Sequence, residues 1–254
     1  MPDGPAEFGV GHGNETMCKA SEYDLALSFW TVAFQYLMLV ENVARETAAQ
    51  GNTWFMTKDA KDGDITVEEY AEDTRWSDHT LIIPLLFNLY HGIELLVKGF
   101  LLASPSQNVK PRHSIGRLCR EFSQAYPDEE GLIAFFGRFT EEQRLPALLS
   151  NFLRENGLTL DDLYQAVRYP SDQDFQALRK YVELKYKGQD GLPFFSELAQ
   201  EIKAIRVAAV RLGRSLEPHT QNGQQPGAPY SDLAARSPQG QLGPLHSNSA
   251  SDND

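Results

Sequence analysis

Apolar residues recur at spacings of three and four along two long stretches of the chain, the pattern of helices with a buried face. The first stretch covers residues 22–50, and Gly51-Asn52 can end it because both residues tolerate left-handed backbone. The second covers residues 78–103, with Asp78 as the expected N-cap. The buried positions expected in the first stretch are Phe29, Trp30, Ala33, Phe34, Leu37, Val40 and Ala44. We therefore predict two long helices that share one core.

The rest of the chain also favours helices, and few segments alternate as strands do. A short helix is expected to start at Thr66, and Thr159 with Asp162 forms a capping-box pattern for another. The remaining expected helices are one over 113–126, two or three short ones within 127–162, one over 172–187 and one over 194–215. The predicted fold class is all-α, a bundle of four to six helices.

Composition at the two ends of the chain sets the expected domain limits. Residues 1–20 and 216–254 are rich in Pro, Gly and small polar residues and cannot bury enough apolar surface to offset their ordering entropy. We expect a flexible lead, a helical domain over residues 21–215 and a disordered tail. The N-terminus is acidic and broken by Pro and Gly, unlike a signal peptide, so a cytoplasmic location is expected.

Charge and cysteine content narrow the classes of partner and cofactor. The formal net charge of −12 disfavours broad coating of nucleic acid, although a local basic groove stays compatible with it. Two cysteines with no CxxC spacing predict neither a disulfide framework nor a thiolate metal site. No phosphate-binding loop, nucleophile elbow or His-Glu-x-x-His motif occurs. We predict no metal site and no cofactor.

The segment over residues 81–103 is apolar enough to be compared with a membrane span. It contains His91, Glu94 and Lys98 near its middle. A charge at the centre of a lipid-facing helix costs about 2.5–3.5 kcal/mol. We therefore predict a core helix of a protein that does not enter the membrane.

Those polar residues form a stripe on the predicted central helix. Asn88, His91, Glu94 and Lys98 step by three and four, so they share a face, and Glu94 with Lys98 has the favourable order for an ion pair. One interpretation is an internally satisfied structural network. The other is a site in which Glu94 acts as acceptor or base, Lys98 contacts phosphate and His91 titrates near neutral pH.

A site would need convergent groups from other elements, and two segments offer them. His113 follows Arg112 and opens a helix that continues with Arg117, and cations near a helix N-terminus suit anions. Arg168 is a lone charge among apolar residues, suited to helix-end carbonyls or to phosphate. The catalytic candidates are His91, Glu94, His113 and Arg168, and the RNA- or nucleotide-binding candidates are Lys98, Arg112, Arg117 and Arg168.

These motifs resemble a known family. The string Tyr90-His-Gly-Ile-Glu94-Leu-Leu-Val-Lys98, the loop after it, and Arg112-His113-Ser-Ile-Gly-Arg-Leu118 are similar to the signature of the HEPN superfamily, as is Arg168-Tyr-Pro. The resemblance implies a helical bundle that often forms homodimers. It also implies roles as metal-independent ribonucleases, as non-catalytic RNA-binding modules, or as partners of small nucleotidyltransferases in toxin–antitoxin and phage-defence systems.

The chain departs from the catalytic members of that family. Their pattern is an Arg, four to six residues, and then a His, whereas no His follows Arg168 at that distance. Arg75 and His79 have only three residues between them. Arg214 and His219 do have four residues between them, but this pair lies where the last helix meets the tail. We therefore expect a non-catalytic RNA-, nucleotide- or protein-binding module. The alternatives are a divergent ribonuclease with His91 or His113 as acid/base and Arg168 on the phosphate, and a purely structural bundle.

Overall fold

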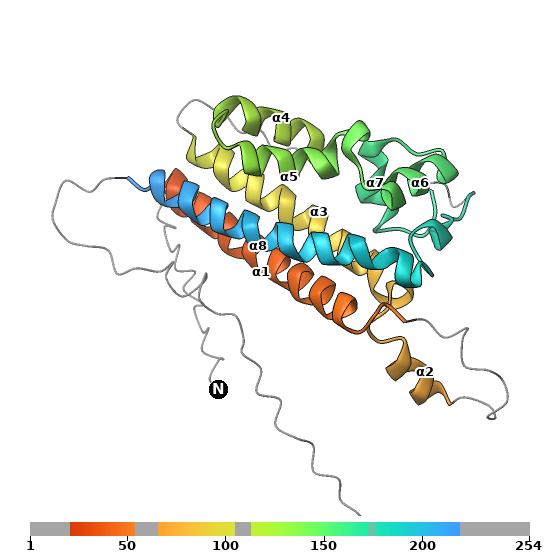
Figure 1. The fold of residues 1–254 in the computed structure, drawn as a ribbon. Coiled ribbons are helices and arrows are strands. Elements are labelled where there is room, and N and C mark those ends of the chain that lie inside the picture. The colour runs from red at the N-terminus through yellow and green to blue at the C-terminus, as the bar shows by residue number, and fades with distance from the viewer. Residues whose placement is uncertain (1–20, 54–65, 105–112, 173, 175, 219–254) are drawn as a thin grey trace, which may run out of the picture.

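The computed structural model describes residues 21–53, 66–104, 113–172, 174 and 176–218. These residues form eight α-helices and no strand, which confirms the all-α class (Figure 1). The segments expected as a flexible lead and most of the expected tail, residues 1–20 and 219–254, lie outside the described residues. The helices are α1 (Glu22–Ala49), α2 (Val67–Asp73), α3 (Asp78–Ala103), α4 (Ile115–Ala125), α5 (Glu130–Thr140), α6 (Ala147–Asn156), α7 (Leu160–Ala166) and α8 (Leu192–Ser215).

Three long helices, α1, α3 and α8, run side by side along the body (Figure 1). The antiparallel α1–α3 pair is the closest, because a Cβ at Gly99 would lie 2.5 Å from the ring of Trp30. Glycine at that position lets the indole lie directly against the α3 backbone, and Trp30 is only 2% exposed. The prediction that residues 78–103 form a central core helix is confirmed.

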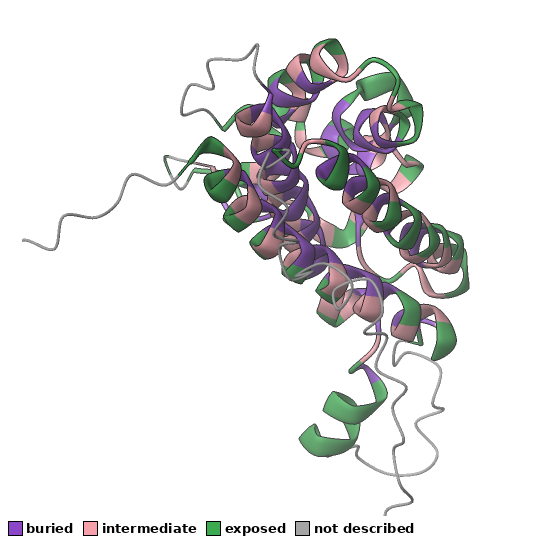
Figure 2. Cartoon of the chain, turned by 90° about the vertical axis from the view of Figure 1, so that its left-hand side faces the viewer, coloured by how far each residue is buried: buried purple, intermediate pink, exposed green. Residues whose placement is uncertain are grey.

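Shorter helices cover the ends of this core. Helices α4 and α5 lie over the C-terminal half of α3, where Phe100, Phe122 and Phe136 form one tilted and edge-to-face ring cluster. Helices α6 and α7 lie toward the other end of the body (Figure 1). Buried positions run along the inner sides of the long helices, whereas α2 is exposed along its length and extends away from the body (Figure 2).

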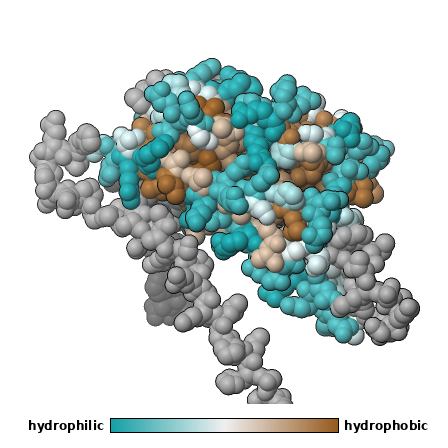
Figure 3. Space-filling model, viewed as in Figure 1, coloured by the Kyte–Doolittle hydropathy of each residue, from teal (hydrophilic) through white to brown (hydrophobic). Residues whose placement is uncertain are grey.

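Helices α1 and α3 are both long and apolar enough to cross a membrane by length and composition alone. More than half of the apolar window of α3, 56%, is buried inside the protein, compared with 33% for α1. The hydrophobicity of α3 is thus largely explained by the core, whereas α1 keeps an apolar side that the described residues do not cover. The face of the molecule in Figure 3 is mainly hydrophilic with scattered hydrophobic patches.

Most predicted helix ends are confirmed. Thr66 and Thr159 each begin a helix with a complete capping box. Gly51 (φ 80°) and Asn52 (φ 50°) have left-handed backbone after α1, and Gly157 (φ 60°) ends α6 in the same way.

Asp78 is not the N-cap that the sequence predicts. Ser77 is the N-cap of α3, and Asp78 lies in the first turn with 1% of its surface exposed. Its carboxylate accepts the backbone N–H groups of Tyr186 and Lys187, both at 2.7 Å, and the side-chain amide of Asn52 at 3.0 Å. Asp78 therefore links the start of α3 to the segment after α1 and to the segment before α8, and it does not cap its own helix.

The helix predicted over residues 172–187 is also wrong. This segment contains an isolated bridge between Ser171 and Leu178 and one 3₁₀ turn, Tyr181–Glu183. Side chains occupy the backbone donors that a helix would use. The Asp172 carboxylate accepts the N–H of Gln176 at 2.7 Å, and the Asn156 amide oxygen accepts the N–H of Lys180 at 2.7 Å.

Candidate functional site

Glu94 is the centre of the predicted polar stripe and is 3% exposed. Its Oε1 accepts a hydrogen bond from Lys98 Nζ at 2.6 Å and lies 3.0 Å from His113 Nδ1. Lys98 follows one turn later on α3, whereas His113 comes from the segment that leads into α4. The structure therefore brings together the stripe and one of its two expected partners. The lysine side chain is 14% exposed and the histidine 82%, so the buried carboxylate joins a largely buried ammonium group to an imidazole at the surface.

His91 lies one turn before Glu94, with Nδ1 3.9 Å from Glu94 Oε2 and 3.2 Å from the Tyr164 hydroxyl. Its ring meets Tyr36 edge-on at 4.7 Å and stacks on Phe87 at 5.9 Å. Burial lowers the pKa of His91, and Lys98 and Arg168 lower it further while Glu94 opposes the shift. Because its ordinary pKa is about 6.5, the imidazole is neutral at pH 7.

Arg168 is exposed and lies beyond Tyr164 in the same line of side chains. Its guanidinium carbon is 5.5 Å from the Tyr164 ring centre, 5.4 Å from Tyr169 and 6.0 Å from Phe87. Phe87 and Tyr164 are stacked within 4° of parallel. These cation–π contacts hold the guanidinium in place without using its hydrogen-bond donors. Its N–H groups remain able to meet an anion.

We call this set of side chains the Glu94 cluster. Its members come from α3, from the approach to α4 and from α7 with the turn after it. They are His91, Glu94, Lys98, His113, Tyr164 and Arg168. The Glu94 carboxylate contacts Lys98 and His113 and lies 3.9 Å from His91, and Arg168 on the Tyr164 ring adds a second permanent cation, a local exception in a chain of net charge −12. Such a set suits a phosphate anion flanked by a flat aromatic group.

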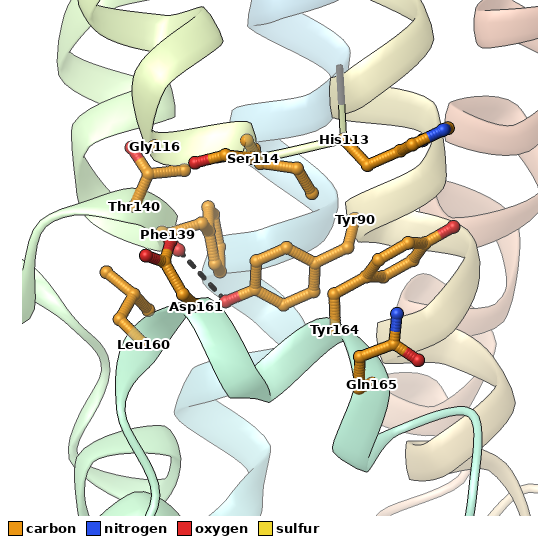
Figure 4. A pocket seen from close by; sticks show the side chains of 11 residues that line it. Tyr90, His113, Ser114, Gly116, Phe139, Thr140, Leu160, Asp161, Tyr164 and Gln165 are labelled. Atoms are coloured by element: carbon orange, nitrogen blue, oxygen red, sulfur yellow. Dashed lines mark hydrogen bonds between the residues drawn. The ribbon is translucent and has the colours of Figure 1, made fainter.

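A pocket of about 290 Å³ adjoins the cluster and shares His113 and Tyr164 with it (Figure 4). The start of α4 and the start of α7 form its two sides. Its inner wall is buried and includes Tyr90, whose hydroxyl donates to the carbonyl of Phe139 at 3.0 Å. The other lining residues are Ser114, Ile115, Gly116, Thr140, Leu160, Asp161 and Gln165. Its volume lies just below the usual range for small-ligand sites.

Not every predicted residue joins the cluster. Asn88 donates its side-chain amide to the carbonyl of Pro84 at 2.7 Å, within its own helix. Arg117, a predicted RNA-binding residue, instead pairs with Glu121 at 3.0 Å on the surface of α4. Arg112 lies outside the described residues.

Sequence reasoning missed the aromatic half of the cluster. Tyr164 is 73 positions from His91 in the chain, and no local pattern predicts that contact. The one available signal was the spacing of Tyr164 and Arg168, four residues apart. That spacing allows a ring and a cation to meet near a helix end. Tyr36 and Phe87 looked like ordinary apolar helix positions.

The lowered pKa of His91 gives a pH prediction. Below about pH 6.5 the unfolded chain binds this proton before the folded chain does, so the free energy of unfolding should fall as the pH falls through that range. Replacing His91 by Gln should remove this part of the pH dependence. Urea unfolding of both proteins between about pH 5 and pH 7.5 measures it, and identical pH profiles would contradict the assigned shift.

The described residues contain no group of three or more His, Cys, Asp or Glu side chains placed to hold a metal ion. In comparisons with known proteins, no family model matches the sequence, and neither a curated protein nor a solved structure matches it significantly.

Proposed function

We propose that this chain is a HEPN-like, non-catalytic helical module that binds RNA or a nucleotide at the Glu94 cluster. One observation supports this most: Lys98 and His113 both contact the buried Glu94 carboxylate, and next to them Arg168 lies on the ring of Tyr164, whose hydroxyl contacts His91. In this proposal Glu94 positions the lysine and the histidine, and it does not touch the ligand itself.

The chemistry of single-stranded RNA fits these groups. Unpaired bases stack on aromatic rings and on guanidinium planes, while cations track the phosphates. Arg168 combines both features, since it is exposed, charged and seated on the Tyr164 ring. Binding at one cluster also agrees with the acidic body, which would repel a nucleic acid from most of the remaining surface.

Replacing Arg168 by Ala should weaken binding of a fluorescent single-stranded RNA about tenfold, the value of one lost stacking or phosphate contact. The dependence of log affinity on log salt should flatten by about 0.7 for each phosphate contact removed. Arg154→Ala is the matched control, because Arg154 is 68% exposed and pairs only with the adjacent Glu155 among the described residues. Fluorescence anisotropy measures both, and equal affinities for the two variants would refute the proposal.

A ribonuclease is the second candidate, and one observation favours it. His91 and His113 approach the same carboxylate, at 3.9 Å and 3.0 Å, and His91 also contacts the Tyr164 hydroxyl. A pair of imidazoles near one phosphate is a reasonable acid/base set. Catalytic members of the family have a His four to six residues beyond an Arg, and no His follows Arg168 at that distance. We therefore favour the non-catalytic module over the ribonuclease. Cleavage of the same RNA in EDTA, lost in both His91→Ala and His113→Ala, would reverse that order.

The cellular setting follows from the resemblance alone. We propose a cytoplasmic role in a bacterial defence or toxin–antitoxin system, with a nucleotidyltransferase or an antitoxin as partner. The similarity of Glu94, Lys98, His113 and Arg168-Tyr-Pro to the family signature is what supports it. Co-purification with the product of a neighbouring gene would test this.

A further inference from the structure

The pocket beside the Glu94 cluster has an apolar interior and polar groups at its two sides. Tyr90 and Phe139 form the buried interior, at 2% and 0% exposed, and their rings meet edge to face. Ser114 at the start of α4 and Asp161 in the first turn of α7 lie on opposite sides of it (Figure 4). A cavity walled by rings, with hydrogen-bonding groups at its edges, suits a flat aromatic ligand.

The two polar side chains are available to a ligand. The Asp161 carboxylate makes no hydrogen bond or ion pair with any residue that the structure describes, whereas the neighbouring Asp162 is used in the capping box of α7. The Ser114 hydroxyl does not cap α4. Figure 4 shows both groups pointing toward Thr140, on the same side of the pocket. A hydrogen-bond acceptor and a hydrogen-bond donor therefore face the same space.

We propose that this pocket holds the base of one nucleotide and selects guanine, which rests on the RNA binding proposed for the Glu94 cluster. A carboxylate accepts two hydrogen bonds side by side, and among the four RNA bases only guanine has two neighbouring donors on its Watson–Crick edge, N1–H and the N2 amino group. Asp161 accepts from both, and the Ser114 hydroxyl donates to O6. The other three bases each offer one donor beside a ring nitrogen or carbonyl oxygen, whose lone pair would face the carboxylate.

The Glu94 cluster accounts for the rest of the nucleotide. His113 and Tyr164 line the pocket and also belong to the cluster. A base in the pocket therefore leaves its ribose and phosphate on the side of the cluster, where Lys98 and Arg168 supply permanent positive charge. The pocket volume of about 290 Å³ is below the usual range for whole small ligands, which agrees with a single base. The pocket then reads the base while the cluster holds the phosphate.

Gly116→Leu fills the pocket without changing its polar side chains. A Cβ at Gly116 would lie 3.7 Å from the Thr140 carbonyl oxygen and 3.8 Å from the Arg120 guanidinium, which are ordinary contact distances, so α4 accepts a side chain at this position. Leucine also has a higher helix propensity than glycine. The folded variant, checked by circular dichroism, should bind oligouridine as wild type does and lose its preference for guanine. Retention of that preference would locate guanine binding outside the pocket and overturn the inference.

Asp161→Asn tests the carboxylate itself. This variant loses the double acceptor for guanine and also a negative charge, so its affinity for a guanine-containing RNA should fall while its affinity for oligouridine stays the same or rises. If Asp161 affected RNA only through its charge, the variant would bind both RNAs more tightly in the same proportion, and that result would overturn the inference. Asp128→Asn is the matched control, because it removes the charge of an exposed aspartate ahead of α5 and should keep the preference for guanine.

The measurement for wild type and all variants is fluorescence anisotropy with four labelled RNA pentamers at one fixed salt concentration. The pentamers are oligouridine and its three derivatives with guanine, adenine or cytosine at the central position. Wild type should bind the guanine pentamer about tenfold more tightly than the other three, the value of one bidentate base contact. Equal affinity for all four, or a preference for another base, would overturn guanine selection and leave RNA binding at the cluster intact. Failure to bind any pentamer would overturn both proposals.

Discussion

Replacement of Glu94 by Leu is expected to lower the free energy of unfolding by about 3 kcal/mol, measured by urea unfolding. The substitution leaves the Lys98 ammonium, whose side chain is only 14% exposed, without the carboxylate 2.6 Å away. A buried charge that loses its partner costs about 3–5 kcal/mol, and partial exposure of this lysine places the effect at the lower end.

The paired substitution is the matched control. When Glu94 and Lys98 both become Leu, no buried charge is left unpaired, and stability should stay within about 1 kcal/mol of wild type or rise. This folded variant should nevertheless lose affinity for RNA, because Lys98 is gone and His113 loses its carboxylate partner. A double variant that binds RNA as well as wild type would support the purely structural interpretation of the stripe. A single variant as stable as wild type would show that the pair is not coupled.

Asp78→Ala is expected to have the largest effect on stability, about 3–5 kcal/mol, or a fall in Tm of roughly 6–20 °C. The carboxylate accepts two backbone N–H groups at 2.7 Å and the Asn52 amide at 3.0 Å, in a position that is 1% exposed. Hydrogen bonds to a charged acceptor contribute about 1.5–3 kcal/mol each. Both backbone donors lose their acceptor in the variant, whereas the Asn52 amide keeps its hydrogen bond to the carbonyl of Gly188 at 2.8 Å.

The location of the loss is as informative as its size. Hydrogen exchange of the Tyr186 and Lys187 amides should become much faster in Asp78→Ala, because Asp78 is the acceptor for both. Asp128→Ala replaces an exposed aspartate ahead of α5 and should leave both stability and exchange unchanged. Protection of the two amides at wild-type levels would contradict the role assigned to Asp78.

The parts of the fold that the sequence predicted are those governed by local chemistry. The limits of α1, α3 and α8 follow from helical periodicity within two residues. The Glu94–Lys98 pair follows from its spacing of one turn, and the helix start at Thr66 and the capping box at Thr159 follow from patterns of four residues.

The predictions that were wrong or missing concern features that depend on contacts between distant segments of the chain. Asp78 looked like an N-cap because its partners lie 108 and 109 positions away. Residues 172–187 looked helical because no local pattern shows that the Asn156 side chain accepts a hydrogen bond from the backbone N–H of Lys180. Tyr164 escaped notice for the same reason, and with it the aromatic side of the Glu94 cluster.

Binding of RNA at the Glu94 cluster can be followed by NMR titration of the histidine ring protons with a short single-stranded RNA. Saturable shifts of the His113 and His91 resonances are expected, each assigned by its His→Gln variant. The His79 resonance should stay unchanged, since that ring contacts Tyr70 and Tyr186, outside the cluster. Saturable binding that leaves the resonances of both cluster histidines unshifted, or the absence of any binding, would contradict RNA binding at the Glu94 cluster.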